Sequence, residues 1–216
     1  MKKLVVKIIL VILIITLGSK AYCFMVMNHI CHAIERFENE ENRYYSVVLK
    51  SKRSTGKQEI WLKDNVLKLE ESKDGEKTYC QWEDFSNGKK YNIDLERKDF
   101  TENVLTKTNK NYLVNLPRLI LNIYKDNQFK MKYFLKIKYI IPIKYNNQKC
   151  YKIVTNQETI IVDRTTGLPI HSVVKFTNSN QDSKYETEIS YEFKVNEVTD
   201  EEIELPDLTG YTKTNE

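Results

Sequence analysis

Glycine, proline and alanine are scarce in this sequence, with 6 glycines, 4 prolines and 2 alanines among 216 residues. The few glycines form no phosphate-cradling loop, and neither a Gly-x-Ser-x-Gly elbow nor a His-Glu-x-x-His helix occurs. These absences remove common signatures of nucleotide hydrolysis, serine hydrolysis and zinc proteolysis. Lysine, asparagine, isoleucine and tyrosine are abundant instead, which is typical of an AT-rich bacterial genome and makes lysine the default residue on exposed strand faces.

The body of the chain also lacks net charge. The formal charge of +4 comes from 34 basic and 30 acidic residues, and the first 21 residues hold four of the lysines and no acid. Removing them leaves 30 basic and 30 acidic residues from Tyr22 onward. A neutral body argues against nucleic-acid binding, because such domains normally carry an excess of positive charge. The hydrophobic fraction of 41% at this length predicts one folded domain.

Residues 1–21 combine a charged start, an apolar run over residues 8–17 and small residues at Ser19 and Ala21. This order predicts a secretory signal peptide, cleaved after Ala21. The apolar stretch resumes at residues 21–27, so an uncleaved membrane anchor, with Lys20 snorkelling to the interface, is the alternative. Lipidation at Cys23 is a third alternative, but the small residue expected before a lipidated cysteine is absent. In each case the following domain is extracytoplasmic, secreted or anchored to the outer face of the cytoplasmic membrane.

Two helices are expected beyond this segment. A helix near residues 116–124 is predicted by Asn115, which can cap it, and by Pro117, which fits a first helical turn. An amphipathic helix is predicted within residues 22–43, because its apolar positions follow helical spacing at Val26, Ile30, Ala33, Ile34 and Phe37.

The rest of the chain is typical of short antiparallel strands. Turn signals at Asp74-Gly75, Asn87-Gly88 and Asn146-Asn147 separate segments of alternating polarity. The strongest alternation covers Met131–Tyr145 and contains Pro142, which should interrupt pairing or mark an edge strand. Residues 98–110 lack periodicity and predict a connecting loop, and residues 209–216 predict a disordered tail.

Together these elements predict an α+β fold. Its main part is a curved antiparallel β-sheet, or half-barrel, over residues 44–208, which forms one domain with the helix of residues 22–43. Two short helices are too few to cover the apolar concave face, so an apolar groove should remain. The side chains expected to face an apolar ligand there are Leu116, Ile120, Ile137, Tyr139, Ile141, Ile189, Tyr191 and Phe193.

A row of lysines accompanies the strongest alternation. It either contacts anionic lipid headgroups at a membrane surface or forms an ordinary solvated strand face. Its members are Lys130, Lys132, Lys136 and Lys138.

Three segments resemble the LolA/LppX-like superfamily of lipoprotein- and lipid-carrier domains, which also includes RseB-type regulators. They are residues 32–37 running into a strand at residues 45–49, the strand–turn–strand unit of residues 150–169 with its Asp163-Arg164-Thr165-Thr166-Gly167 turn, and the closing residues 191–208. The turn is also explained by turn chemistry alone, because aspartate bonds its own backbone and glycine supplies a positive φ. The resemblance implies a half β-barrel that binds acyl chains or a protein partner, with no catalytic residues and no cofactor.

The remaining cysteines and histidines give weak evidence of a disulfide, a metal site or a catalytic pair. Cys80 and Cys150 either pair as a disulfide in an oxidising compartment or are small apolar residues in strands. His29 and His32 share a helical face but lack enough further ligands for a metal site. His171 and Ser172 are adjacent in a strand and therefore point to opposite faces, which excludes a nucleophile–base pair.

We therefore expect a non-enzymatic extracytoplasmic protein that binds lipid or lipoprotein. The alternative is a membrane-tethered sensory or structural ectodomain that binds a protein partner, of the anti-sigma or envelope-stress type.

Overall fold

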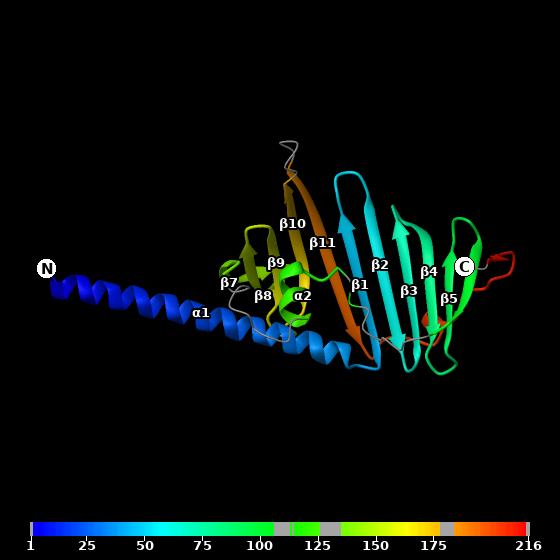
Figure 1. Cartoon of the computed structure of the whole chain (residues 1–216), viewed down its shortest axis with the longest axis horizontal. Coiled ribbons are helices and arrows are strands. Elements are labelled where there is room, and N and C mark those ends of the chain that lie inside the picture. Colours follow the sequence, from blue (N-terminus) through cyan, green and yellow to red (C-terminus); the bar gives the residue numbers. More distant parts are fainter. Residues whose placement is uncertain (1, 106–112, 114, 126–134, 178–183, 215–216) are drawn as a thin grey trace.

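The computed structural model describes residues 2–105, 113, 115–125, 135–177 and 184–214. This part of the chain consists of a long N-terminal helix, a short second helix, an open twelve-stranded sheet and one 3-10 turn, η1 (Glu201–Ile203). Figure 1 shows the strands side by side, with α1 crossing one end of the sheet and extending beyond it. The sheet does not close into a barrel, because β7 and β12 form its two edges. The expected combination of an open sheet and few helices is confirmed at this level.

The N-terminal helix is continuous. α1 (Lys2–Glu38) runs through the expected boundary at residue 21 and ends at Glu38, short of residue 43. The chain then enters β1 (Asn42–Lys50) after three residues. The Arg43 guanidinium donates hydrogen bonds to the carbonyl groups of Glu38 and Glu40, which lie at the helix end. The bond to Glu38 satisfies a carbonyl group that the helix leaves without an intrahelical partner, and the bond to Glu40 holds the turn that follows.

The strands are antiparallel neighbours throughout, apart from the last one. The sheet order is β12-β6-β5-β4-β3-β2-β1-β11-β10-β9-β8-β7, so β11 closes the sheet beside β1. The remaining strands are β2 (Thr55–Lys63), β3 (Val66–Lys73), β4 (Glu76–Asp84), β5 (Lys89–Asp94), β6 (Asp99–Val104), β7 (Ile137–Tyr145), β8 (Gln148–Thr155), β9 (Glu158–Asp163), β10 (Pro169–Thr177), β11 (Lys184–Val195) and β12 (Thr212–Lys213).

The expected turns lie between these strands. Asp74 and Gly75 have φ values of 52° and 93°, and Asn146 and Asn147 have 48° and 64°, as two-residue hairpins require. At the end of β9, the Asp163 Oδ1 atom accepts hydrogen bonds from the backbone N–H groups of the two threonines that follow, at 2.6 and 2.8 Å. The turn predictions are therefore confirmed.

Two expectations near the C-terminal edge of the sheet are wrong. β6 lies inside the predicted loop of residues 98–110. The strand was not predicted because its residues on the concave side are polar and face the polar side of β5, so they give no apolar alternation. Residues 209–214 are not a disordered tail, since β12 pairs in parallel with β6. The Lys213 ammonium also lies 2.7 Å from the Glu102 carboxylate, so the tail is held to the sheet by charge as well.

The core lies between the C-terminal half of α1 and the concave face of the sheet. Met27, Ile30 and Ile34 are completely buried there. They belong to one cluster with apolar side chains of β1, β2, β3, β7, β8, β9 and β11. The second helix, α2 (Arg118–Lys125), adds its own buried stripe to this cluster, and it begins two residues later than expected. The free half of α1 and the packed half thus have different environments within one helix.

Strand β7 differs from its expected orientation. A β-bulge between Ile137 and Tyr139 inserts one residue, and the alternation of faces shifts at that point. Ile140 is therefore buried, whereas Tyr139 and Ile141 are 45% and 42% exposed on the opposite face. The prediction that Tyr139 and Ile141 face the concave side is wrong for this reason. Pro142 does lie in an edge strand, as predicted.

Of the two alternatives for Cys80 and Cys150, the structure has the small apolar strand residues and not the disulfide. Cys80 in β4 and Cys150 in β8 are both free and buried. Six strands separate β4 from β8 in the sheet. At about 4.8 Å per strand spacing, the two cysteines are far outside the 7 Å between Cα atoms that a disulfide allows.

Candidate functional site

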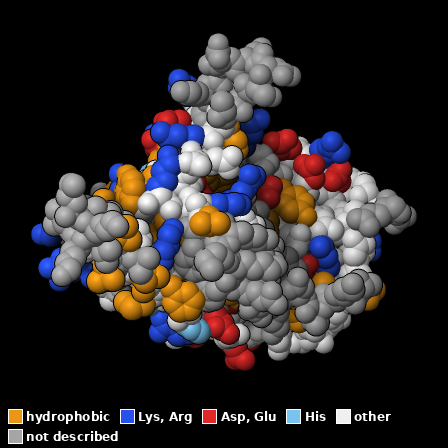
Figure 2. All heavy atoms as spheres, turned by 60° about the vertical axis from the view of Figure 1, so that its left-hand side comes forward, with side chains coloured by type: hydrophobic (Ala, Val, Ile, Leu, Met, Phe, Trp, Pro, Cys, Tyr) orange, Lys and Arg blue, Asp and Glu red, His pale blue; other side chains and the backbone are white. Residues whose placement is uncertain are grey.

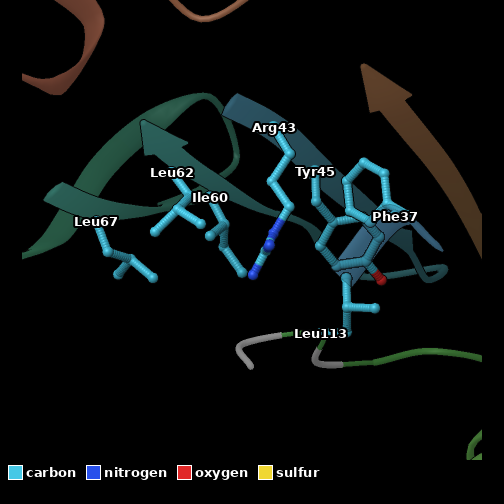
Figure 3. A pocket seen from close by; sticks show the side chains of 7 residues that line it. All are labelled: Phe37, Arg43, Tyr45, Ile60, Leu62, Leu67 and Leu113. Carbon is cyan, nitrogen blue, oxygen red and sulfur yellow. The ribbon is translucent and has the colours of Figure 1, made fainter. Parts of the chain in front are cut away.

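The space between the end of α1 and the sheet is almost completely filled. A cavity of about 10 Å³ remains there, enough for about one water molecule. Figure 3 shows the Arg43 guanidinium reaching between Ile60 and Tyr45, with Phe37 packed beside Tyr45. Burial lowers the pKa of Arg43, and its bonds to the end of α1 compensate for that burial. An acyl chain has no room in this part of the concave face.

A larger hollow lies on the other side of α2, and we call it the α2 groove. It is open to solvent and has a volume of about 850 Å³, within the range of small-molecule sites. It is bounded by α2, by the N-terminal end of β9 and by parts of β1, β10 and β11. Its apolar walls are Leu49, Leu116, Leu119, Leu121, Val174, Phe176 and Ile189.

Hydrogen bonds from the sheet position the segment that forms one wall of this groove. The Tyr191 hydroxyl donates to the carbonyl group of Asn115 at 3.2 Å and lies 3.0 Å from the Ser172 hydroxyl. Asn115 has a φ of 58°, and its side chain bonds Gln58 instead of capping α2. In the first turn of the helix, the Leu119 N–H donates to Oε2 of the Glu158 carboxylate at 3.5 Å. A carboxylate near a helix N-terminus also interacts favourably with the helix dipole.

Glu158 is the most unusual polar group of the groove. It is 6% exposed, and its Oε1 atom has no hydrogen-bond partner among the described residues. Burial raises the pKa of Glu158, although the backbone N–H groups at the start of α2 and the nearby Arg118 act in the opposite direction. The groove therefore holds a carboxyl group that gives up its proton less readily than an exposed glutamate.

The rim of the groove is basic. Arg118, Lys136 and Lys175 line it, and Lys175 also lies 3.4 Å from the Glu186 carboxylate. Apolar walls and a basic rim together are complementary to a molecule with an apolar chain and an anionic group.

The predicted ligand-facing residues divide among three places. Leu116 and Ile189 line the α2 groove. Tyr139 and Ile141 lie on the outer face of the sheet. Those that instead pack in the core are Ile120, Ile137, Tyr191 and Phe193.

Of the predicted lysines, Lys136 lies at the groove rim and Lys138 is exposed on β7, while Lys130 and Lys132 lie outside the described residues. Sequence reasoning missed Val174, Phe176 and Glu158. The alternation of β10 carries a signal for the first two. Glu158 approaches α2 across 39 residues of sequence, so no local pattern indicates it.

The histidines have structural surroundings. No group of three metal-binding side chains occurs among the described residues. The His29 ring packs against Gly167, where an added Cβ atom would lie 2.9 Å from its Nε2 atom. His171 stacks on Tyr145, whereas Ser172 points to the other face and bonds Tyr191. The turn before β10 therefore serves to seat α1 on the sheet.

Comparison with solved structures gives weak likenesses at low sequence identity. No family model and no curated protein matches the sequence. An uncharacterized conserved protein from Thermus thermophilus aligns with 10% identity and a TM-score of 0.46, over 85% of this chain and 96% of that one. MucB aligns with 12% identity and a TM-score of 0.43, over 86% of this chain and 63% of that one.

A second match is to the complex structure of Pseudomonas aeruginosa MucA and MucB, with 10% identity and a TM-score of 0.39, over 82% of this chain and 61% of that one. This chain thus spans about three fifths of the MucB chains. With all three TM-scores below 0.5, these likenesses do not assign the chain to a family.

Proposed function

We propose that this protein is a membrane-tethered extracytoplasmic domain that binds the apolar chain of an anionic lipid or lipoprotein in the α2 groove. The observation that carries this proposal is the α2 groove itself, which joins apolar walls to a basic rim. The cavity at the end of α1 is too small for an acyl chain, which favours the α2 groove as the ligand site.

Continuity of α1 supports the tether. Residues 7–38 form a helix long and apolar enough to cross a membrane, a property that signal sequences share. Its N-terminal part exposes large apolar side chains, such as Leu10 at 58% and Leu17 at 62%. From Cys23 onward the same helix enters the core, without a linker. An anchored form would hold the domain directly at the membrane surface.

Photo-crosslinking in the native host tests ligand binding. The full chain is expressed in cells fed a fatty acid that carries a diazirine near the end of its chain, irradiated, purified and mapped by mass spectrometry. We expect adducts on peptides from β10 and α2, because these elements form the apolar walls. Adducts restricted to residues 4–19, or none at all, would contradict the ligand site. Intact mass of the same sample tests the tether, since cleavage after Ala21 would remove the anchor.

A protein partner is the second candidate function, and the filled space beneath α1 favours it. A cavity of 10 Å³ is expected if the domain's own side chains occupy the place of a ligand. A second sample, crosslinked from a photoreactive residue on the outer face of the sheet, separates the candidates, because a partner-binding domain would give protein-sized adducts there. Lipid adducts in β10 and α2 without such species would exclude this alternative.

A further inference from the structure

The path of α1 across the sheet identifies the edge that lies closest to the membrane. Phe37 packs edge-on against Phe193 of β11, with ring centroids 4.9 Å apart. Nearer the N-terminus, the His29 ring lies against Gly167, between β9 and β10. Nearer still, Tyr22 packs against Tyr151 of β8, with centroids 6.4 Å apart. The helix thus crosses the strands in the order of the sheet and leaves it past β7, as Figure 1 shows.

The bilayer boundary on α1 falls close to the level of β7. The apolar run ends at Leu17, and Lys20 follows one turn later. Tyr22 lies at β8, and β7 is one strand spacing, about 5 Å, farther toward the N-terminal end. Since a helix rises about 1.5 Å per residue, β7 lies near the level of residues 18–20.

The β7 edge carries side chains that suit a lipid surface. Leu135 is 74% exposed, and Tyr139 and Ile141 are 45% and 42% exposed after the bulge. The 21 residues from Leu135 to Thr155 contain five lysines and no acidic residue, in a body whose total charge is zero. Figure 2, turned toward this end of the molecule, shows hydrophobic side chains and lysines or arginines near one another, on the side where the exposed part of α1 also lies. Pro142 and the lysines also disfavour pairing of this edge with another strand, so a peptide strand is a poor occupant.

We propose that the β7 edge is a membrane-contact surface, which places exposed apolar side chains and lysines of the β7–β8 hairpin on the anionic leaflet crossed by α1. The contact rests on the tether proposed above and adds an orientation to it. Aromatic and aliphatic side chains enter the interface while lysines interact with lipid phosphates. The α2 groove, whose rim includes Lys136, would then lie beside the source of its lipid.

Tryptophan quenching in nanodiscs tests this surface. The full chain is reconstituted in discs of phosphatidylglycerol with or without brominated acyl chains, and the wild-type signal of Trp61 and Trp82 is subtracted. We expect bromolipid to quench Ile141→Trp but not Val104→Trp, which is 80% exposed on β6 near the opposite edge. Tyr139→Trp is a second probe if Ile141→Trp does not fold. Equal quenching at positions 141 and 104 overturns the contact.

Charge reversal tests the lysines in the same discs. Lys136→Glu with Lys138→Glu should lower the quenching of the tryptophan at position 141, whereas Lys50→Glu with Lys52→Glu at the exposed β1–β2 hairpin should not. Unchanged quenching in the first variant overturns the electrostatic part of the proposal. A chain that fails to enter the discs refutes the tether, and the contact with it. A chain that enters without quenching at positions 139 and 141 refutes the contact alone.

Discussion

Replacing Phe176 by alanine should weaken ligand binding without unfolding the domain. Phe176 lines the α2 groove and is 50% exposed. An aromatic side chain can bury 150–250 Å² of surface, so a half-exposed one leaves about 100 Å² that a ligand could cover. At about 25 cal/mol per Å², full cover contributes about 2.5 kcal/mol, and half cover contributes about half of that. We expect Phe176→Ala to raise the Kd by about one to two orders of magnitude.

Equilibrium dialysis of labelled decanoate against the full chain in nanodiscs measures this change, with empty discs subtracted. Val104→Ala is the matched control, because it removes an exposed apolar side chain far from the groove. Urea unfolding of both variants should stay close to wild type, since neither side chain is buried. A Kd within twofold of wild type for Phe176→Ala would refute the assignment of the ligand to the α2 groove.

Three further predictions concern folding. Burial raises the pKa of Glu158 above its ordinary 4.5, so the free energy of unfolding of the wild type should fall as the pH rises through the raised pKa. Glu158→Gln should lose that decline in urea titrations from pH 4 to 8. Parallel pH profiles of the two proteins would contradict the burial of this carboxyl group. Gly167→Ala should lower the free energy of unfolding in urea by about 2–4 kcal/mol, because φ is 77° and the new methyl group would lie 2.8 Å from a side-chain carbon of α1. The control, Gly56→Ala, meets nothing within 4 Å and should cost less. Cys80 and Cys150 should both react with a thiol reagent after unfolding without reductant, and a linked peptide pair would contradict the sheet order.

Local chemistry explains which parts of the fold could be predicted from the sequence. Asp74-Gly75 and Asn146-Asn147 specify their hairpins because the backbone conformation depends on those residues alone. The stripe of α1 from Val26 to Phe37 was predictable because helical spacing and burial coincide there. These features needed no knowledge of distant partners.

The incorrectly predicted features depend on partners far along the chain. The bulge in β7 is a property of its pairing with β8, so the alternation of β7 alone assigned Tyr139 and Ile141 to the concave side. β6 lacks an apolar face because it pairs with the polar end of the sheet. The α2 groove likewise depends on Glu158, whose role arises only when β9 meets α2. Two of the eight expected ligand-facing residues line that groove, because a shared apolar face does not distinguish a packed core from an open site.

The pairing of β1 with β11 has a consequence for how the domain folds. These two strands lie at the centre of the sheet, yet Lys50 pairs with Glu188, 138 residues later. The hairpins from β1 to β6 and from β7 to β11 can form from neighbouring residues, but they join into one sheet only through the pairing of β1 with β11. Long-range pairing of this kind slows folding. A chain that stops before residue 184 would therefore leave two separate half-sheets and an N-terminal helix whose apolar stripe is only partly covered.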